Sequence, residues 1–360
     1  MILPTANKHK KDGVVTMLDD LKYIHEKDRE DALGVAERQC SQLTKEYDLS
    51  HLHFENILNV IYIGMGGSAL PAQMAKSWPM LSVPFEIIRD YDIPFYVGKQ
   101  TLVIAASYSG NTEETIEALG KAETRGAQIV VIDSGGKLQQ IAEERSHPYF
   151  SIPKAEQPRY AVFSMFRAVV DVLAVAGLVR AEDVFGEMEA AAAHVTEASK
   201  AWRPEVPTRH NAAKQLAQEL LGKSVVIYSS ASMFAAAYKW KISCNENAKQ
   251  IAWCSQLPEF NHNEFIGWSE QPHNKPYAVV DLRSHLDHPR IQKRFEVSQR
   301  LLSGMRPAPQ VVEVQGSTHL EQLLWAIMFG DFVTLYLGIL NGLDPAPVVL
   351  VEKFKKAMDE

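Results

Sequence analysis

The sequence predicts an α/β protein with parallel sheets, built from a unit that occurs twice. Short apolar runs alternate with helical spacing, and several runs are apolar throughout, as strands covered on both faces of a sheet are. A strand, a turn of small residues and a helix at 59–78 recur in the same order at 223–250, which indicates a degenerate internal repeat. We expect strands at 59–63, 85–91, 102–107, 127–134, 148–153, 223–230, 275–282 and 309–314.

Helical spacing supplies the remaining elements and the domain boundaries. A leading helix is expected at 17–46, and later helices at 69–78, 113–123, 163–179, 181–199, 211–222, 234–250, 289–302, 319–340 and 348–358. The segment 201–208 contains two prolines and little periodicity, so it is the expected linker. The predicted domains are therefore 1–200, with the leading helix, and 209–360, with the closing helix.

Composition excludes several classes of protein. The 360 residues carry a formal net charge of −7, which gives a nucleic-acid partner no electrostatic support. The three cysteines show no CxxC spacing, which suggests a reducing compartment and no zinc cluster or other metal site. The N-terminus does not resemble a signal peptide, and no run is expected to reach the ~20 apolar residues of a membrane span. We expect a cytoplasmic protein.

The segment from Ser107 to Thr112 is the strongest functional signal. This hydroxyl-rich turn, SYSGNT, joins an apolar strand to a helix that begins with acidic residues. Unpaired N–H groups at a helix start, together with the hydroxyls of Ser107, Ser109 and Thr112, favour binding of a phosphate monoester. The alternative is that Ser109 or Thr112 merely caps the helix.

A second loop, Gly64 to Ser68, also joins a strand to a helix. Its glycines are too closely spaced for a dinucleotide fingerprint, and Asp90 is only a weak match to the acidic residue of that motif. Gly67 and Ser68 belong either to a second anion site or to a turn that only needs glycine. Both loops follow strand carboxyl ends, where doubly wound sheets bind ligands.

Four further residues carry possible chemistry. Glu246 lies between two asparagines in a predicted helix, where asparagine is unfavourable, so a polar pocket is expected. His262 lies between asparagines near Trp268, and Arg159 and Lys355 are basic. Each taken alone is also compatible with an ordinary surface or turn position. Together with a phosphate cradle they suit aldose–ketose isomerisation, which needs a base, a cation near the enediolate and a ring-opening acid/base pair, but no cofactor.

The motifs together resemble one family. GMGGSA, SYSGNTEET, QPRYA, NENAK, the HN of FNHNEF and a lysine in the last helix occur in this order in the bifunctional phosphoglucose/phosphomannose isomerases, members of the sugar isomerase (SIS) domain superfamily. The resemblance covers nearly the whole chain. It implies two SIS domains, each with a five-stranded parallel sheet in a three-layer α-β-α sandwich.

The resemblance also implies roles for individual residues. Arg159 matches the arginine that steadies the enediolate, and Glu246 matches the base that moves the proton between C1 and C2. His262 and Lys355 match the ring-opening groups, and the family site forms in a homodimer whose neighbouring subunit lends the histidine. The expected phosphate-binding residues are Gly67, Ser68, Ser107, Ser109 and Thr112.

One departure from the family concerns specificity. The family has a threonine before the last helix that is associated with accepting both epimers, whereas this chain has Ala346 or, under a shifted alignment, Val348. Two functions of other classes are alternatives to the isomerase. A non-catalytic SIS regulator would bind the same sugar phosphate but would not need Glu246, His262 and Lys355. An amide-transferring SIS enzyme would bring a glutaminase domain, which the sequence does not contain.

Overall fold

The computed structural model describes residues 17–49, 52–78, 81–155, 158–269 and 276–358, which form two compact units. Unit 2 comprises Arg38–Val195 and Ser317–Leu323, and unit 1 takes the described residues of Met1–Glu37, Thr196–Gly316 and Leu324–Glu360. Helix α2 (Leu21–Lys27) therefore belongs with the second half of the chain, whereas the sequence grouped the leading helix with the first half.

Unit 2 contains a parallel five-stranded sheet in the order β2-β1-β3-β4-β5. Each strand corresponds to one predicted apolar run, and β3 is buried along its whole length. Adjacent strands β1 and β3 place the two glycine- and serine-containing loops at the same edge of the sheet, as expected. The strands are β1 (Asn59–Ile63), β2 (Phe85–Ile88), β3 (Thr101–Ser107), β4 (Gln128–Asp133) and β5 (Tyr149–Ser151).

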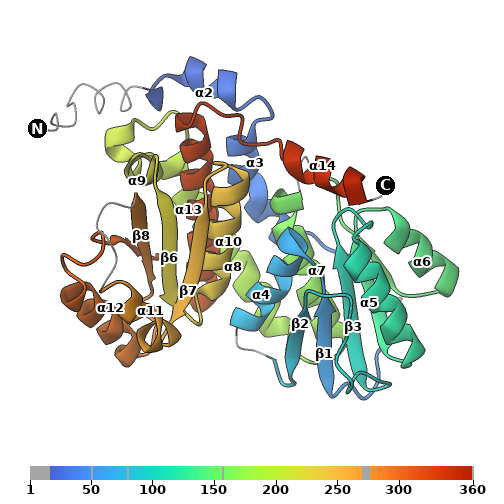
Figure 1. Ribbon diagram of the computed structural model, residues 1–360. Helices are drawn as coiled ribbons and strands as arrows, with labels where there is room; N and C mark the ends of the chain where they lie inside the picture. Colours follow the sequence, from blue (N-terminus) through green and yellow to red (C-terminus); the bar gives the residue numbers. More distant parts are fainter. Residues whose placement is uncertain (1–16, 50–51, 79–80, 156–157, 270–275, 359–360) are drawn as a thin grey trace, which may run out of the picture. The chain divides into compact units, whose positions relative to one another are not determined.

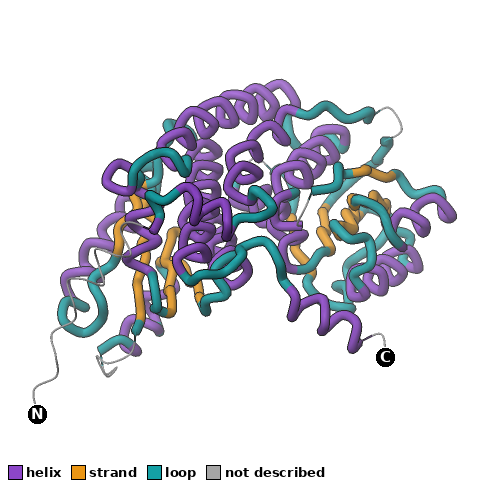
Figure 2. Tube along the Cα trace, turned by 90° about the horizontal axis from the view of Figure 1, so that it is seen from above, coloured by secondary structure: helices purple, strands orange, loops and turns teal. Residues whose placement is uncertain are grey.

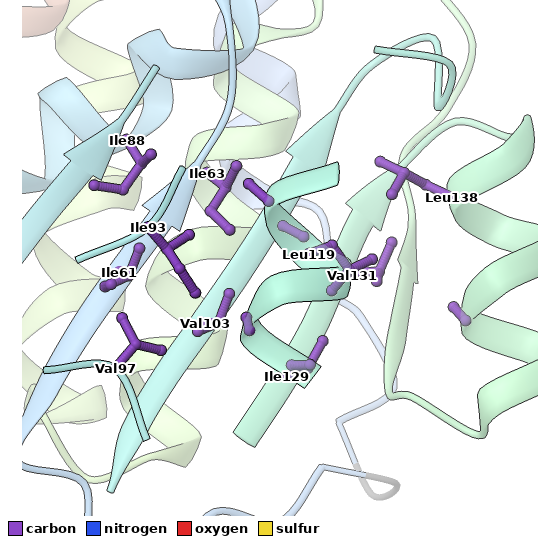
Figure 3. Packing of buried hydrophobic residues seen from close by; sticks show 14 residues of the cluster. Ile61, Ile63, Ile88, Ile93, Val97, Val103, Leu119, Ile129, Val131 and Leu138 are labelled. Carbon is purple, nitrogen blue, oxygen red and sulfur yellow. The ribbon is translucent and has the colours of Figure 1, made fainter. Parts of the chain in front are cut away.

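Helices cover both faces of this sheet, which gives the predicted three layers (Figures 1 and 2). Figure 3 shows the core on one face, where β-branched strand residues such as Ile61, Val103 and Val131 meet Leu119 and Leu138. Two of the helices pack against each other, α4 and α7. The helices of this unit are α4 (Leu70–Ser77), α5 (Glu113–Thr124), α6 (Lys137–Arg145), α7 (Val162–Val175) and most of α8 (Ala181–Ser199), with short 3₁₀ turns at Gln39–Thr44, Gly66–Ala69 and Pro158–Tyr160.

Unit 1 repeats this plan with one strand fewer. Its sheet is parallel, in the order β7-β6-β8-β9, so its described part has four strands where the family resemblance implied five. A cluster of Tyr228, Phe260, Trp268 and Phe295 covers one face. The elements are β6 (Ser224–Ser230), β7 (Ala252–Leu257), β8 (Tyr277–Arg283), β9 (Gln310–Glu313), α9 (Ala212–Leu220), α10 (Phe234–Glu246), α11 (Glu264–Gly267), α12 (Pro289–Leu301), α13 (His319–Leu340, which begins in unit 2) and α14 (Val349–Met358).

Two predicted helices differ from the structure for identifiable reasons. The leading helix is interrupted, because the Asp28 carboxylate accepts the N–H groups of Ala32 and Leu33 and caps a new helix, α3 (Ala32–Arg38). The helix predicted at 234–250 ends at Glu246, and the following strand β7 was not predicted. Strand β7 lies at the sheet edge and carries polar and partly exposed residues, so it lacks the apolar run by which the other strands were found.

Helix α13 has the length and hydrophobicity of a membrane span, which the sequence analysis did not expect. Its most apolar window has a mean hydropathy of 1.9, yet all of that window is buried within the protein. The helix is therefore a core element, and its apolar circumference reflects burial on every side.

Helices α10 and α13 approach closely because α13 presents glycine at the contact. An added Cβ at Gly330 would lie 2.2 Å from Nε1 of Trp240, which donates a 2.7 Å hydrogen bond to the Ala326 carbonyl. At Gly338 an added Cβ would lie 2.5 Å from the Asn247 carbonyl oxygen. Glycine is thus required at two positions of α13 if α10 is to pack at this distance.

We predict that Gly330→Ala destabilises unit 1. A methyl group at this contact forces Trp240 to move, and overpacking of this kind costs about 1–3 kcal/mol. Gly186→Ala in α8 is the matched control, because an added Cβ there meets no atom within 4 Å and removing a helical glycine stabilises by about 0.5–1 kcal/mol. The midpoint of urea unfolding, followed by tryptophan fluorescence, should fall for Gly330→Ala and not for Gly186→Ala. An unchanged midpoint for Gly330→Ala would contradict the packing argument.

Candidate active site

The three hydroxyls of the SYSGNT turn lie together at the start of α5. Ser107 Oγ is 2.7 Å from Thr112 Oγ1 and 3.4 Å from Ser109 Oγ. Thr112 occupies the N-cap position, yet its side chain accepts no hydrogen bond from the N–H groups of α5. Simple capping by Thr112 is therefore excluded, and the helix start keeps donors that an anion can use.

The backbone of this turn requires glycine. Gly110 has φ +65°, and an added Cβ would lie 1.6 Å from the carbonyl oxygen of Gly135 in the next loop. Asn111 secures the same junction, because its Oδ1 accepts the Lys137 N–H and its amide donates to the Ser109 carbonyl. The turn is therefore held by contacts with its neighbouring loop.

The Gly64–Ser68 loop joins the same cluster. The Tyr108 N–H donates to Ser68 Oγ at 3.0 Å, and the Tyr62 hydroxyl donates to the Ser68 carbonyl at 2.6 Å. Ser68 is thereby linked to the turn that carries Ser107 and Ser109. The structure thus brings together four of the hydroxyl residues chosen from the sequence.

Arg159 lies next to this loop. A Cβ built on Gly67 would lie 3.9 Å from the Arg159 Cα, so the two backbones pass close to each other. The arginine side chain is 1% exposed, and its guanidinium lies 4.8 Å from the centre of the Tyr160 ring. This burial argues against the surface arginine that the sequence left open.

Asp133 is a feature of the site that the sequence analysis did not identify. It ends β4 beside Ser107 in the strand register and accepts the Gly135 N–H at 2.9 Å. Burial raises its pKa to about 6. A carboxyl group that is partly neutral near pH 6 places less negative charge beside an anion-binding turn than an ordinary aspartate would. The run AQIVVIDS reveals a strand but contains no signal for this burial.

Glu246 is the last residue of α10 in unit 1, and it is half-buried. The end of α10 is held by polar contacts with α13. Lys239 forms a buried ion pair with Asp331 and donates to Ser243 Oγ at 2.8 Å, and Ser243 in turn donates to Asp331. These contacts fix the helix one turn before Glu246.

A polar pocket was expected around Glu246, but the polar residues beside it in the sequence instead form hydrogen bonds that stabilise the fold. Asn247 is buried and donates to Thr334, while Asn245 accepts the Ala252 N–H of β7. Lys249 donates to the carbonyls of Asp344 and Pro345 at 2.9 and 3.0 Å. The NENAK motif thus ties the end of α10 to the segment that precedes α14.

This segment contains the position where the family threonine is absent. Ala346 is fully buried and its N–H donates to Asp344 Oδ1, whereas Val348 is partly exposed. Lys355 lies in α14, but its side chain is outside the described residues. The contacts of Lys249 therefore link the Glu246 end of α10 to the segment just before α14.

His262 is exposed at the end of a 3₁₀ turn, Glu259–His262. Its two asparagine neighbours fix that turn. Asn261 bonds to Ser298 and Arg294 of α12, and Asn263 bonds to Glu259. The histidine side chain therefore points outward from a secured loop. The four hydroxyl residues and Arg159 belong to unit 2, while Glu246 and His262 belong to unit 1.

Comparison with known proteins identifies the family. Residues 209–358 match the model of the bacterial phospho-glucose isomerase C-terminal SIS domain, and residues 53–177 match the SIS domain. A bifunctional phosphoglucose/phosphomannose isomerase of Caldicellulosiruptor bescii is 33% identical over 328 residues, which is 89% of this chain and 96% of the relative. The chain belongs to the bifunctional phosphoglucose/phosphomannose isomerase family.

Another relative with the same name matches to a similar extent, whereas one relative is named for a different reaction. The Aquifex aeolicus relative is 30% identical over 83% of this chain and 90% of its own length. A D-glucosamine-6-phosphate 4-epimerase of Sulfolobus acidocaldarius is 33% identical over 61% of this chain and 67% of its own length. The family relationship alone therefore does not define the reaction.

Solved structures agree on the fold. A hypothetical protein of Thermus thermophilus matches with a TM-score of 0.66 at 15% identity, over 97% of this chain and 93% of that one. A structure described as a putative phosphosugar isomerase of Clostridium difficile 630 matches with a TM-score of 0.66 at 14% identity, over 90% and 97% of the two chains. Both likenesses support the two-domain SIS fold that this isomerase family has.

We predict that Thr112→Val weakens binding of a phosphate ester. Valine keeps the shape of threonine but removes one hydroxyl of the cluster, and a hydrogen bond to a charged group contributes about 1.5–3 kcal/mol. The dissociation constant for glucose 6-phosphate, measured by calorimetry, should rise roughly 10- to 100-fold. Thr124→Val at the opposite end of α5 is the matched control, since Thr124 donates only to the Lys121 carbonyl. Equal affinity in the two variants would contradict a phosphate site here.

Proposed function

We propose that the protein interconverts glucose 6-phosphate, and also mannose 6-phosphate, with fructose 6-phosphate through a cis-enediolate. The observation that carries this proposal is the cluster of Ser107, Ser109 and Thr112, whose hydroxyls bond one another and leave the N-terminus of α5 to an anion. Membership of the isomerase family supports the same substrate class.

Each chemical step is assigned to a residue. Gly67, Ser68 and the three hydroxyls hold the phosphate, and Arg159 stabilises the negative charge of the enediolate. Glu246, as an ionised carboxylate, removes the proton from C2 of the aldose and returns it to C1. The hydroxyl proton of O2 passes to O1, so that C2 becomes the ketone and C1 the alcohol. His262 and Lys355 transfer the protons that open the sugar ring. No cofactor or metal has a role in this scheme.

The proposal includes a homodimer in the cytoplasm. An exposed His262 on a loop fixed by Asn261 and Asn263 is suited to reach the site of a neighbouring subunit, as the family resemblance implies. Exposed Ile266 on the adjacent helix α11 offers apolar surface for that contact.

Two other functions are distinguished by the products formed. A non-catalytic regulator would bind the sugar phosphate without turnover. An epimerase acting at C4, the reaction named for the Sulfolobus acidocaldarius relative, would yield no ketose from glucose 6-phosphate.

We predict that both aldose phosphates yield fructose 6-phosphate with kcat/KM values within roughly tenfold of each other, a difference of about 1.4 kcal/mol. Small or apolar residues at 346 and 348 leave room for either configuration at C2. A coupled assay for fructose 6-phosphate with each substrate measures the ratio. A hundredfold preference for glucose 6-phosphate would contradict the argument from space. Val348→Thr would then test the missing hydroxyl at the partly exposed position without a change of size.

We predict that Glu246→Gln lowers kcat by a factor of about 10² to 10⁴, because glutamine keeps the size of the side chain but cannot accept the proton. Calorimetric affinity for glucose 6-phosphate should stay unchanged. Exchange of the substrate C2 proton with deuterated water, followed by NMR, should disappear together with turnover. Continued exchange at the wild-type rate would assign the base to another residue.

The same variant tests the shared site. Glu246→Gln and His262→Ala proteins, each inactive alone, are mixed under conditions that exchange subunits. Part of the activity should return if His262 acts on the neighbouring subunit's substrate. Absence of activity despite exchange, as shown by differently tagged subunits, would contradict the lent histidine.

A further inference from the structure

Unit 1 lacks a chain segment that unit 2 has. In unit 2, residues 134–161 connect β4 to α7 and contain α6 and the edge strand β5. In unit 1, only residues 314–318 connect β9 to α13. The remaining strands have the same order in both sheets, so the position beside β9 corresponds to the position that β5 fills in unit 2. Among the described residues, β9 has a strand neighbour on one side only.

A groove runs along this open edge. It encloses about 580 Å³ and is lined by all four residues of β9, Gln310–Glu313. One wall is α9, whose lining residues include Ala212, Leu216 and Glu219, at the spacing of a single helix face. A space of this size lies within the usual range for ligand sites, and it follows the whole length of β9, since all four residues of the strand line it.

The floor of the groove is aromatic. Trp202 lies 5.3 Å from Trp325 and 5.2 Å from Phe329 between ring centroids, and the latter two rings are stacked at 4.9 Å. All three side chains are at most 8% exposed, so the floor is closely packed. Val311 of β9 is 39% exposed beside it.

The rim is acidic. Glu219 of α9 and Glu313 of β9 line the groove and are exposed, and no lysine, arginine or histidine is among its lining residues. Glutamine side chains from α9 and β9 add neutral donors and acceptors. An unpaired strand edge, an apolar floor and an acidic rim together describe a site for an extended, cationic polypeptide.

We propose that β9 accepts an extended segment of another protein, rich in lysine or arginine, as a fifth strand of the unit 1 sheet. Backbone hydrogen bonds to β9 provide affinity, apolar side chains lie on the floor formed by Trp202, Trp325 and Phe329, and basic side chains pair with Glu219 and Glu313. The inference does not depend on the isomerase activity.

The test uses the full-length protein and a fluorescein-labelled heptapeptide of alternating lysine and valine. Fluorescence anisotropy should give saturable binding that weakens when the salt concentration rises from about 50 to 500 mM. Glu219→Gln/Glu313→Gln should weaken binding roughly fivefold, because both ionic contacts are lost. The matched control, Glu182→Gln/Glu296→Gln, alters exposed glutamates outside the groove and should bind as the wild type does.

Three results would overturn the proposal. The first is no saturable binding of the lysine–valine peptide. The second is equal binding of a peptide in which glutamate replaces lysine, or equal binding by the groove variant. The third is a dimer, detected by sedimentation velocity, that Val311→Lys dissociates, since the edge would then belong to a second copy of this chain.

Discussion

The buried ion pair between Lys239 and Asp331 supports much of unit 1. Both side chains are at most 1% exposed, and Ser243 bonds to each of them. Removing one partner of such a pair leaves a charge buried without compensation, which typically costs about 3–5 kcal/mol. This cost holds α10 in one position along α13, with Trp240 against Gly330 and Asn247 against Thr334. The position of Glu246 follows from this packing, because it lies between Ser243 and Asn247, which both bond to α13.

The hydroxyl cluster of Ser107, Ser109 and Thr112 in unit 2 is supported in a different way. Its side chains are short, and the turn is fixed by the close approach of Gly110 to Gly135 and by the two hydrogen bonds of Asn111. Short side chains on a fixed turn lose little entropy when a ligand binds. The hydroxyls already bond to one another, so under the proposed function a phosphate would replace these bonds with bonds to itself.

Local signals in the sequence predicted much of this arrangement. The strand, hydroxyl turn and helix around Ser107 could be predicted because each part has its own pattern within a few residues, and the matching loop at Ser68 followed from the rule on strand ends. The tasks of Asn247 and Lys249 could not be predicted, since their partners lie 87 and 95 residues away. Strand β7 was not predicted because it is an edge strand, which does not need a continuous apolar run. The role of Asp133 was not predicted because the burial of a single carboxyl group leaves no pattern in the sequence. The roles of His262 and Lys355 rest on the family resemblance alone.

The hydrophobicity of α13 has a consequence for synthesis in the cell. This helix has the length and apolar composition of a membrane span, and its most apolar window is fully buried in the finished fold. Because α10 and the strands of the unit 1 sheet precede α13 in the sequence, the ribosome releases them first, and the surface that buries α13 can form before it. A substitution that delays folding of α10 therefore exposes a span-length apolar segment to the membrane-insertion and degradation machinery. In such a variant the damage would appear as loss of protein in the cell rather than as loss of catalytic rate.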